Sequence, residues 1–431
     1  MAFRLPIRDP SSLLRHGALL VFANLCGALC NAAFHMISGR LLSPPEYTAL
    51  AAMLGIVLAA STPMGAIQNT LAHYTALFLQ NGAPGRVLPF YRRFYRPFFL
   101  FACALAVLAV LFRAPLAALW PDASPALVAL AFATLGFSLL MPVGYGLLQG
   151  RQSFVALAWI PQAWGSTRLL LAALLLAFVS RTALAALSAQ AAGVAVTLLL
   201  LALAASNPAP SGSAPSGGAA SCRASSSCPP LSYALLSFLA LAAFAALANL
   251  DVALARHWFP TSPSTDLFAK AATIARTAIF LPQPLAVALF PKVASDGSLP
   301  AGSPLLLRRA LLVSALLALV AAAVCWLFPA LPWTILYGAV DPALAPDAFA
   351  SLRAMALALT PLALAYPLLQ FALAQRRFRT ALPILLPALL YLLVLSWRHP
   401  GLLAIPHALL AASTLALLSL LLPTLPLLRG K

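Results

Sequence analysis

The side chains that could do chemistry in this sequence are a few charged residues inside long apolar runs. Arg168 and Arg276 are the deepest, and neither has an acidic residue within a helical turn of it. Each lies about ten or more residues from an end of its run, which is about 15 Å at the helical rise of 1.5 Å per residue. A guanidinium at that depth in lipid costs about 2.5–3.5 kcal/mol. Each arginine must therefore find a partner on another helix or face a wet cavity, and we favour the cavity.

Four other polar residues in the apolar runs are candidates for a site. Asp251 is the only acidic residue inside such a run, and Lys270 lies at a comparable depth in the next run. This placement predicts an Asp251–Lys270 ion pair; the alternative roles of Asp251 are proton or ion coupling, or a contact with a substrate. Asn24 and His35 lie in the first run, where a histidine is usually structural and substrate binding is the alternative. The arginines at predicted outer helix ends, which we expect to snorkel to the interface, are Arg40, Arg256 and Arg353.

Motifs for covalent chemistry are absent from the sequence. There is no Walker A loop, no dinucleotide-binding glycine motif and no Ser, His and Asp set of useful spacing. The six cysteines show no metal-ligand spacing. We therefore expect no cofactor, no metal site and no enzyme activity.

The composition requires lipid around most of the molecule. Of the 431 residues, 63% are hydrophobic and only 8% are charged, whereas soluble domains carry about 25% charged residues. The net charge is +18, but the basic residues stand in short gaps between apolar runs. That placement is typical of membrane orientation and not of nucleic-acid binding, so no nucleic-acid partner is expected.

The segment 83–97, APGRVLPFYRRFYRP, alternates arginine with tyrosine and phenylalanine. Nucleic-acid binding would use similar residues. Because the segment adjoins two apolar runs, we interpret it as an interfacial segment that touches anionic lipid headgroups.

Twelve apolar runs are long enough to cross a membrane, which takes about 20 residues in a helix. The sequence therefore predicts an all-α integral membrane protein. The predicted helices are 17–38, 48–72, 95–113, 125–149, 154–178, 183–205, 232–256, 267–292, 305–328, 348–373, 380–397 and 401–428.

The break in this pattern defines the predicted domains. Residues 206–231 consist almost entirely of Ser, Pro, Gly and Ala, too few large apolar residues to fold. We interpret them as a flexible cytoplasmic linker between a six-helix bundle of residues 1–205 and another of residues 232–431.

Basic residues also predict the orientation. With both termini in the cytoplasm, 17 basic residues fall inside, within 1–16, 86–96, 151, 223, 292–309, 376–379 and 429–431. Only four fall outside, namely Arg40, Arg113, Arg181 and Arg398. This asymmetry follows the positive-inside rule. It also supports the helix count, because one missed helix would move the basic residues of every later loop to the opposite side.

Two further patterns concern the second and eighth helices. Glu46–Ala52 (EYTALAA) and Asp266–Ala272 (DLFAKAA) open them at an offset of 220 residues, 266 minus 46, which indicates an internal repeat of the kind transporters commonly contain. Pro282 and Pro284 remove two backbone donors within one turn, so we expect the eighth helix to bend there.

Three stretches resemble a known family. Residues 35–61, HMISGRLLSPPEYTALAAMLGIVLAAS, are similar to the opening of bacterial polysaccharide flippases. Residues 144–176 contain LLQGRQSFVALA and then Arg168 in the fifth helix, as that family does. Residues 248–259 with 269–294 resemble its seventh helix, with N-x-D at Asn249 to Asp251, and its eighth, which ends in LFP. The family is that of O-antigen and capsular polysaccharide flippases, in the superfamily of multidrug, oligosaccharidyl-lipid and polysaccharide exporters.

The resemblance implies two six-helix bundles in a V shape that work by alternating access in the bacterial inner membrane. It implies a polyprenyl-diphosphate-linked oligosaccharide as substrate, with membrane lipids and other polysaccharide-assembly proteins as partners. In such folds helices one, two, seven and eight line the cavity, where Asp251, Lys270 and Arg276 lie. Lipid II flippases carry several cations in helix one. Here the first predicted helix holds no Lys or Arg before Arg40 and offers Asn24 and His35 as candidates, which argues against lipid II.

Two alternatives remain. An ion-coupled multidrug exporter of the same fold would usually carry carboxylates inside the membrane, and no apolar run of the first half holds one. A membrane-embedded glycan polymerase or ligase would carry a large polar outer loop, and none is visible. The flippase interpretation leaves Arg168 and Arg276 to bind the diphosphate as a bidentate pair.

Overall fold

The computed structural model describes residues 10–120, 123–206, 231–260, 262–276 and 303–428, and all the secondary structure in these ranges is helical. The first half contains α1 (Pro10–Leu41), α2 (Pro44–Ser61), η1 (Thr62–Met64), α3 (Gly65–Gln80), η2 (Pro84–Arg86), α4 (Val87–Leu111), α5 (Arg113–Ala117), α6 (Pro125–Ser138), α7 (Met141–Gly150), α8 (Phe154–Phe178) and α9 (Ala183–Ser206). The second half contains α10 (Leu231–Asn249), α11 (Asp251–Trp258), α12 (Pro263–Ala275), α15 (Ser303–Leu327), α16 (Ala330–Tyr337), α17 (Ala345–Ala374), α18 (Phe378–Ala381), η3 (Leu382–Ile384), α19 (Leu385–Trp397) and α20 (Ala404–Leu428).

Each of the twelve predicted helix ranges overlaps a helix of the described residues, so the all-helical fold is confirmed. Nine described helices are long and apolar enough to span a membrane, and the α10–α11 pair makes a tenth. The other two predicted spans correspond to α1 and α12, each of which adjoins residues outside the description. Almost all of the linker 206–231 lies outside the residues that the structure describes.

Serine and proline set several helix starts. Pro44 and Pro125 occupy the first turn of α2 and α6, and each follows an extended serine. Proline suits that position because its fixed φ is helical and its missing N–H would have no partner there. Ser124 also caps α6 by accepting a hydrogen bond from the Leu127 N–H at 3.2 Å.

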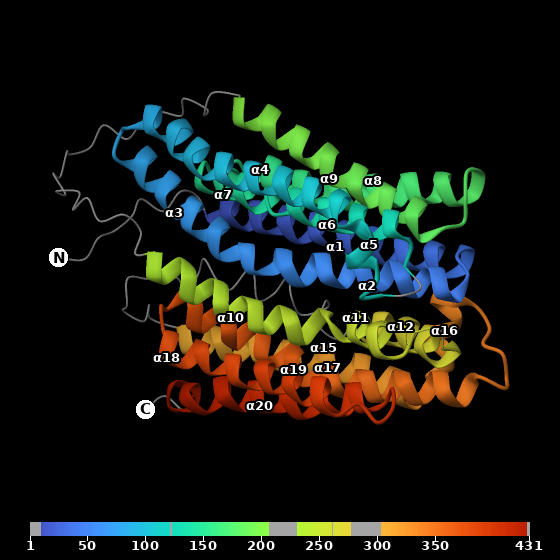
Figure 1. The fold of residues 1–431 in the computed structure, drawn as a ribbon. Coiled ribbons are helices and arrows are strands. Elements are labelled where there is room, and N and C mark those ends of the chain that lie inside the picture. The colour runs from blue at the N-terminus through green and yellow to red at the C-terminus, as the bar shows by residue number, and fades with distance from the viewer. Residues whose placement is uncertain (1–9, 121–122, 207–230, 261, 277–302, 429–431) are drawn as a thin grey trace.

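The helices form two groups that meet along α2 and α10 (Figure 1). In the first group α8 packs against α1 and α9, α3 against α7, and α4 against α6. In the second group α17 packs against α12, α15 and α20. The contact between the groups is made by α2 with α10, α11 and α12, by α3 with α10, and by α1 with α16.

Glycines allow the closest of these approaches. Gly146 and Gly150 lie four residues apart on α7, and a Cβ on either would stand within 2.8 Å of α3 atoms, including the Gln68 carbonyl oxygen. Small residues at this spacing let membrane helices pack backbone to backbone. Gly55 does the same between the two groups, since a Cβ there would lie 2.5 Å from the Asn249 carbonyl oxygen. The middle of α2 is thereby pressed against the point where α10 ends.

The described residues contain a helix break that the sequence did not predict. The seventh predicted helix is not continuous: α10 and α11 meet at Leu250 with a bend of 56°. Pro161, Pro361 and Pro367 remain inside continuous helices, whereas Pro63 lies in the short 3₁₀ segment that joins α2 to α3. The expected bend at Pro282 and Pro284 lies outside the described residues.

The topology leads to the first prediction. Reporter fusions at residue 90 and within 206–231 should give cytoplasmic signals, and fusions at residues 120 and 340 external ones, because 17 basic residues then lie inside and four outside. A cytoplasmic signal at residue 340 would contradict the assignment of the second half.

Candidate translocation site

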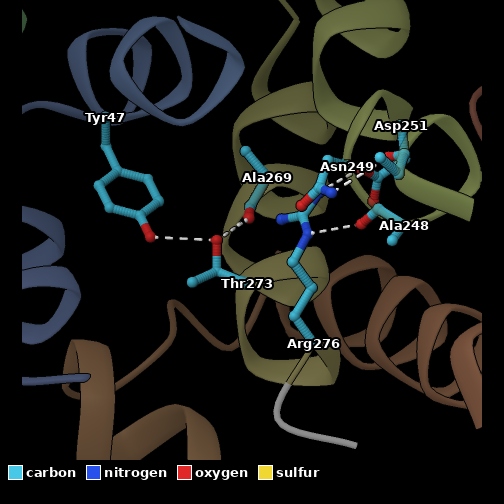
Figure 2. Close-up of polar contacts among 8 residues, drawn as sticks. Tyr47, Ala248, Asn249, Asp251, Ala269, Thr273 and Arg276 are labelled. Carbon is cyan, nitrogen blue, oxygen red and sulfur yellow. Dashed lines mark hydrogen bonds and ion pairs between the residues drawn. The ribbon is translucent and has the colours of Figure 1, made fainter. Parts of the chain in front are cut away.

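A hydrogen-bonded group of four side chains joins the two halves where α1, α2, α12 and α16 meet. The hydroxyl of Tyr47, at the start of α2, lies 2.7 Å from the Tyr337 hydroxyl, 3.2 Å from Thr273 Oγ1 and 3.2 Å from His35 Nδ1. Tyr47 is completely buried. We call these four residues the tyrosine cluster; Figure 2 shows Tyr47 directed at Thr273.

The proton positions in this cluster follow from its geometry. Thr273 Oγ1 donates to the Ala269 carbonyl at 2.9 Å, so it accepts the Tyr47 proton. The Tyr47 oxygen then accepts from Tyr337 and from His35 in the arrangement that satisfies every contact, with the His35 proton assigned to Nδ1. Every member is thus satisfied by a specific partner, and the cluster holds α2 against α12 and α16.

Further polar contacts close the same end of the interface between the halves. Arg40 donates to the carbonyls of Ile335 and Leu336 at 2.7 and 3.1 Å, which caps the C-terminal end of α16. Thr48 Oγ1 donates to the Asp266 carboxylate at 2.6 Å. The remaining contacts are Trp120 Nε1 to the Ala253 carbonyl at 3.1 Å, Arg256 to the Pro45 carbonyl at 3.0 Å and His257 Nδ1 to the Leu119 carbonyl at 2.6 Å. This end is the outer one in the predicted orientation.

Arg256 corrects one expectation about the outer arginines. It does not snorkel to the interface, since it is only 3% exposed. Its guanidinium instead donates to the Pro45 carbonyl at the start of α2. Arg40 is exposed, as expected, although its guanidinium also bonds to backbone.

Arg168 lies in the core of the first half and is 3% exposed. Its guanidinium donates to Asn31 Oδ1 on α1 at 2.5 Å and to Gln190 Oε1 on α9 at 3.0 Å. The rings of Phe34 and Trp164 lie 4.1 and 4.5 Å from its central carbon. Arg168 thus has partners on other helices, which was one of the two positions expected for it; the other, which we favoured, was a wet cavity. All of these partners in the described residues are electrically neutral, and the buried Nε has none.

The Asp251–Lys270 pair expected from the sequence is wrong, because Asp251 forms its ion pair with Arg276 (Figure 2). The bend at Leu250 places Asp251 at the start of α11, with its carboxylate directed at the guanidinium of Arg276 at the end of α12. Arg276 Nε also donates to the Ala248 carbonyl at 3.2 Å, a group that the break leaves without its helical donor. Asp251 is 0% exposed. Arg276 therefore has a fixed counter-ion and does not face a wet cavity in the way expected.

Lys270 occupies a different position, one turn from the tyrosine cluster. Its ammonium lies 5.3 Å from the centre of the Tyr337 ring, within the range of a cation–π contact. The lysine is only half-buried, unlike Arg168 and Arg276. It is therefore the most accessible cation of the predicted set.

Asn24 and His35 lie on α1, on either side of the Arg168 contacts. Asn24 Oδ1 accepts a hydrogen bond from Gln162 Nε2 on α8 at 3.1 Å, and His35 belongs to the tyrosine cluster. The structure thus places His35 in the tyrosine cluster and Lys270 beside it. Arg168 lies against α1 and α9, and Arg276 lies against the break between α10 and α11.

Sequence reasoning missed the neutral members of this site. Asn31, Gln190 and Thr273 are polar residues inside apolar runs, and that signal could have pointed to them. Tyr47 and Tyr337 gave no such signal, because tyrosine near a helix end is common at the membrane interface. No group of three metal-binding side chains occurs in the described residues.

Comparison with known proteins shows which solved structures share this fold. No protein-family model matches the chain, and no curated protein is significantly similar to it in sequence. Its structure is similar to an inward-facing multidrug resistance MATE family transporter of the MOP superfamily, with a TM-score of 0.71 at 11% identity, over 96% of this chain and 99% of that one. It is also similar to the lipid II flippase MurJ in an inward-closed conformation, with a TM-score of 0.70 at 12% identity, over 94% of this chain and 87% of that one.

A third similar structure is that of the MATE multidrug transporter DinF-BH, with a TM-score of 0.69 at 13% identity, over 99% of both chains. Because the identities are this low, the likeness establishes the fold alone. The chain is a multi-pass membrane protein with the V-shaped, twelve-helix fold of these transporters. The polysaccharide flippase family expected from the sequence stays a prediction.

The tyrosine cluster leads to the second prediction. Tyr337→Phe removes one buried hydroxyl and its hydrogen bond across the halves, worth about 1 kcal/mol, so the population open at the outer end should rise about fivefold. The measurement is the distance distribution between spin labels at Ser43 and Ser262, in a background without the native cysteines. Tyr233→Phe is the matched control, since Tyr233 bonds within the second half to the Leu373 carbonyl. Equal distributions in the two variants would show that the cluster does not hold this end closed.

Proposed function

We propose that this chain translocates a polyprenyl-diphosphate-linked oligosaccharide across the bacterial inner membrane by alternating access. The fold supports transport, since its structural relatives are transporters and one of them is a flippase of a lipid-linked substrate. In this proposal the two halves, residues 1–205 and 232–431, rock about the interface between α2 and the helices α10 to α12. The linker 206–231 and both termini lie in the cytoplasm.

The observation that carries the proposal is that the Arg168 guanidinium is buried among electrically neutral partners. A buried positive charge is stable only with compensation, yet the described residues give this guanidinium amide oxygens and aromatic faces and no carboxylate. The first half contains only three acidic residues, Asp9, Glu46 and Asp122. Of these, Glu46 accepts a hydrogen bond from the Ala183 N–H. The substrate would supply the missing anion.

A diphosphate suits this position chemically. Its oxygens accept charge-assisted hydrogen bonds, which are about twice as strong as those to neutral amides, so it can displace Asn31 and Gln190 from the guanidinium. Lys270 would add a second, more accessible cation, and Asn24 and His35 would contact the sugar or the diphosphate. Arg276 is the weaker candidate of the predicted pair, because Asp251 already neutralises it.

The conformation fits one step of such a cycle. The outer end is closed by the tyrosine cluster and by the contacts of Arg40, Thr48 and Arg256. A substrate drives transport only if it binds the two states with different affinities. Binding of the diphosphate near His35 would add charge beside the tyrosine cluster and so favour its opening.

Drug export is the second candidate, since two of the similar structures are multidrug transporters. Ion-coupled export by this chain would need an exchangeable membrane carboxylate. The first half holds none in its apolar runs, and Asp251 is engaged by Arg276. These observations favour the lipid-linked substrate.

Deletion of the gene tests the proposal. The deletion strain should accumulate lipid-linked oligosaccharide on the cytoplasmic side, with loss of surface polysaccharide and unchanged drug sensitivity. Extracted carrier lipids are quantified by mass spectrometry before and after complementation. Normal carrier-lipid levels together with increased drug sensitivity would support the exporter instead.

A further inference from the structure

The inner end of α4 carries an arginine patch that the translocation site does not use. Arg92, Arg93 and Arg96 are all exposed. On a helix, residues three and four apart share a face, so Arg92 and Arg93 both lie one turn from Arg96. Three like charges so close repel one another, and an anion would relieve that repulsion.

A shallow, open apolar groove of about 280 Å³ on the surface of α4 itself begins directly beside this patch. It is lined by Tyr95, Arg96, Phe99 and Leu100. The rings of Tyr95 and Phe99 lie nearly parallel, with centroids 6.1 Å apart and an interplanar angle of 16°. Leu100 is 67% exposed and continues the face on which Arg92 and Arg96 lie.

The order of these groups along α4 matches the depth profile of a lipid leaflet. The arginines come in the first turns of the helix, and after Pro97 the sequence is apolar through Phe112. At 1.5 Å per residue, Leu100 lies about 6 Å deeper than Arg96. The arginines therefore stand at headgroup depth and the groove at acyl-chain depth.

We propose that this groove binds one anionic phospholipid of the inner leaflet. Its phosphate contacts Arg96 and Arg92, and the first part of one acyl chain lies along Tyr95, Phe99 and Leu100. Charge complementarity selects the anionic headgroup, because three exposed guanidiniums meet no acidic side chain in this part of the sequence. Apart from the Arg96 side chain the lining of the groove is apolar, so it suits an acyl chain better than a polar ligand.

The test is lipid retention by the purified, detergent-solubilised chain, measured by native mass spectrometry with phosphatidylglycerol and phosphatidylcholine as probes. The wild type should retain one phosphatidylglycerol in preference to phosphatidylcholine. Arg92→Gln with Arg96→Gln should weaken that retention about thirtyfold, because each arginine near the surface contributes about fivefold. Leu100→Trp, which fills the groove without a change of charge, should also weaken it.

The matched control is Arg308→Gln with Arg309→Gln, two exposed arginines at the start of α15 on the same predicted side. It should retain the lipid as the wild type does. Equal losses in the two double variants would overturn the proposal in favour of general charge attraction. Displacement of phosphatidylglycerol by an equal concentration of a polyprenyl phosphate would also overturn it, since the groove would then hold the carrier lipid. Neither result bears on which substrate is transported.

Discussion

Arg168→Ala is expected to abolish transport while the protein stays inserted in the membrane. Two charge-assisted hydrogen bonds to a diphosphate are worth about 1.5–3 kcal/mol each, so their loss lowers binding by more than a hundredfold. Arg168→Lys should keep partial activity. A lysine retains the charge, but its ammonium cannot bind the diphosphate through two parallel hydrogen bonds as a guanidinium can.

The readout for Arg168 is surface polysaccharide in a flippase-null strain, with the protein level measured by blot. Arg168→Met separates charge from packing, because its chain still fills the space between Phe34 and Trp164. Arg353→Gln is the matched control, since Arg353 also lies near a tryptophan ring, that of Trp326, and donates to the Trp326 carbonyl at 3.1 Å, with none of the contacts of Arg168. Full complementation by Arg168→Ala would show that the arginine is structural.

Asp251→Asn should sharply lower the amount of folded protein. It leaves the Arg276 guanidinium buried without its counter-ion, and breaking a buried pair on one side costs about 3–5 kcal/mol. Arg276→Gln should be equally harmful, because a carboxylate that is 0% exposed would lose its cation. The double variant removes both charges and should recover much of the loss.

Thermal aggregation of the detergent-solubilised protein measures these effects. Lys270→Gln alone should change the midpoint little, because Lys270 contacts the Tyr337 ring and not Asp251. If Lys270→Gln, and not Arg276→Gln, restored the Asp251→Asn protein, the pairing in the structure would be contradicted. A stable Asp251→Asn protein without transport would indicate a coupling role for the carboxylate.

The helices could be predicted from the sequence because lipid imposes a simple requirement. A chain must bury about 20 apolar residues in a helix to cross the membrane, and that pattern is local. The deep positions of Arg168 and Arg276 were equally visible. What each arginine contacts was not, because the partners of Arg168 come from α1 and α9, 137 and 22 residues away.

The error about Asp251 has a physical cause. Two residues at the same depth on adjacent helices look like a pair if both helices are straight. The bend of 56° at Leu250 redirects the start of α11, so the carboxylate meets Arg276, not Lys270. No proline or glycine marks that bend, since the sequence there is Ala248-Asn249-Leu250-Asp251. Arg276 stabilises the bend by donating to the Ala248 carbonyl, and that contact depends on tertiary structure.

The central claim is tested most directly in proteoliposomes that contain the purified chain and a fluorescent polyprenyl-diphosphate-linked oligosaccharide. Flipping is followed by quenching of the label that reaches the outer leaflet. The wild type should accelerate flipping over protein-free vesicles, and Arg168→Met should not, whereas Arg353→Gln should resemble the wild type. The account would be contradicted if the wild type gave no acceleration, or if it flipped an uncharged polyprenyl-linked oligosaccharide, without the diphosphate, equally fast.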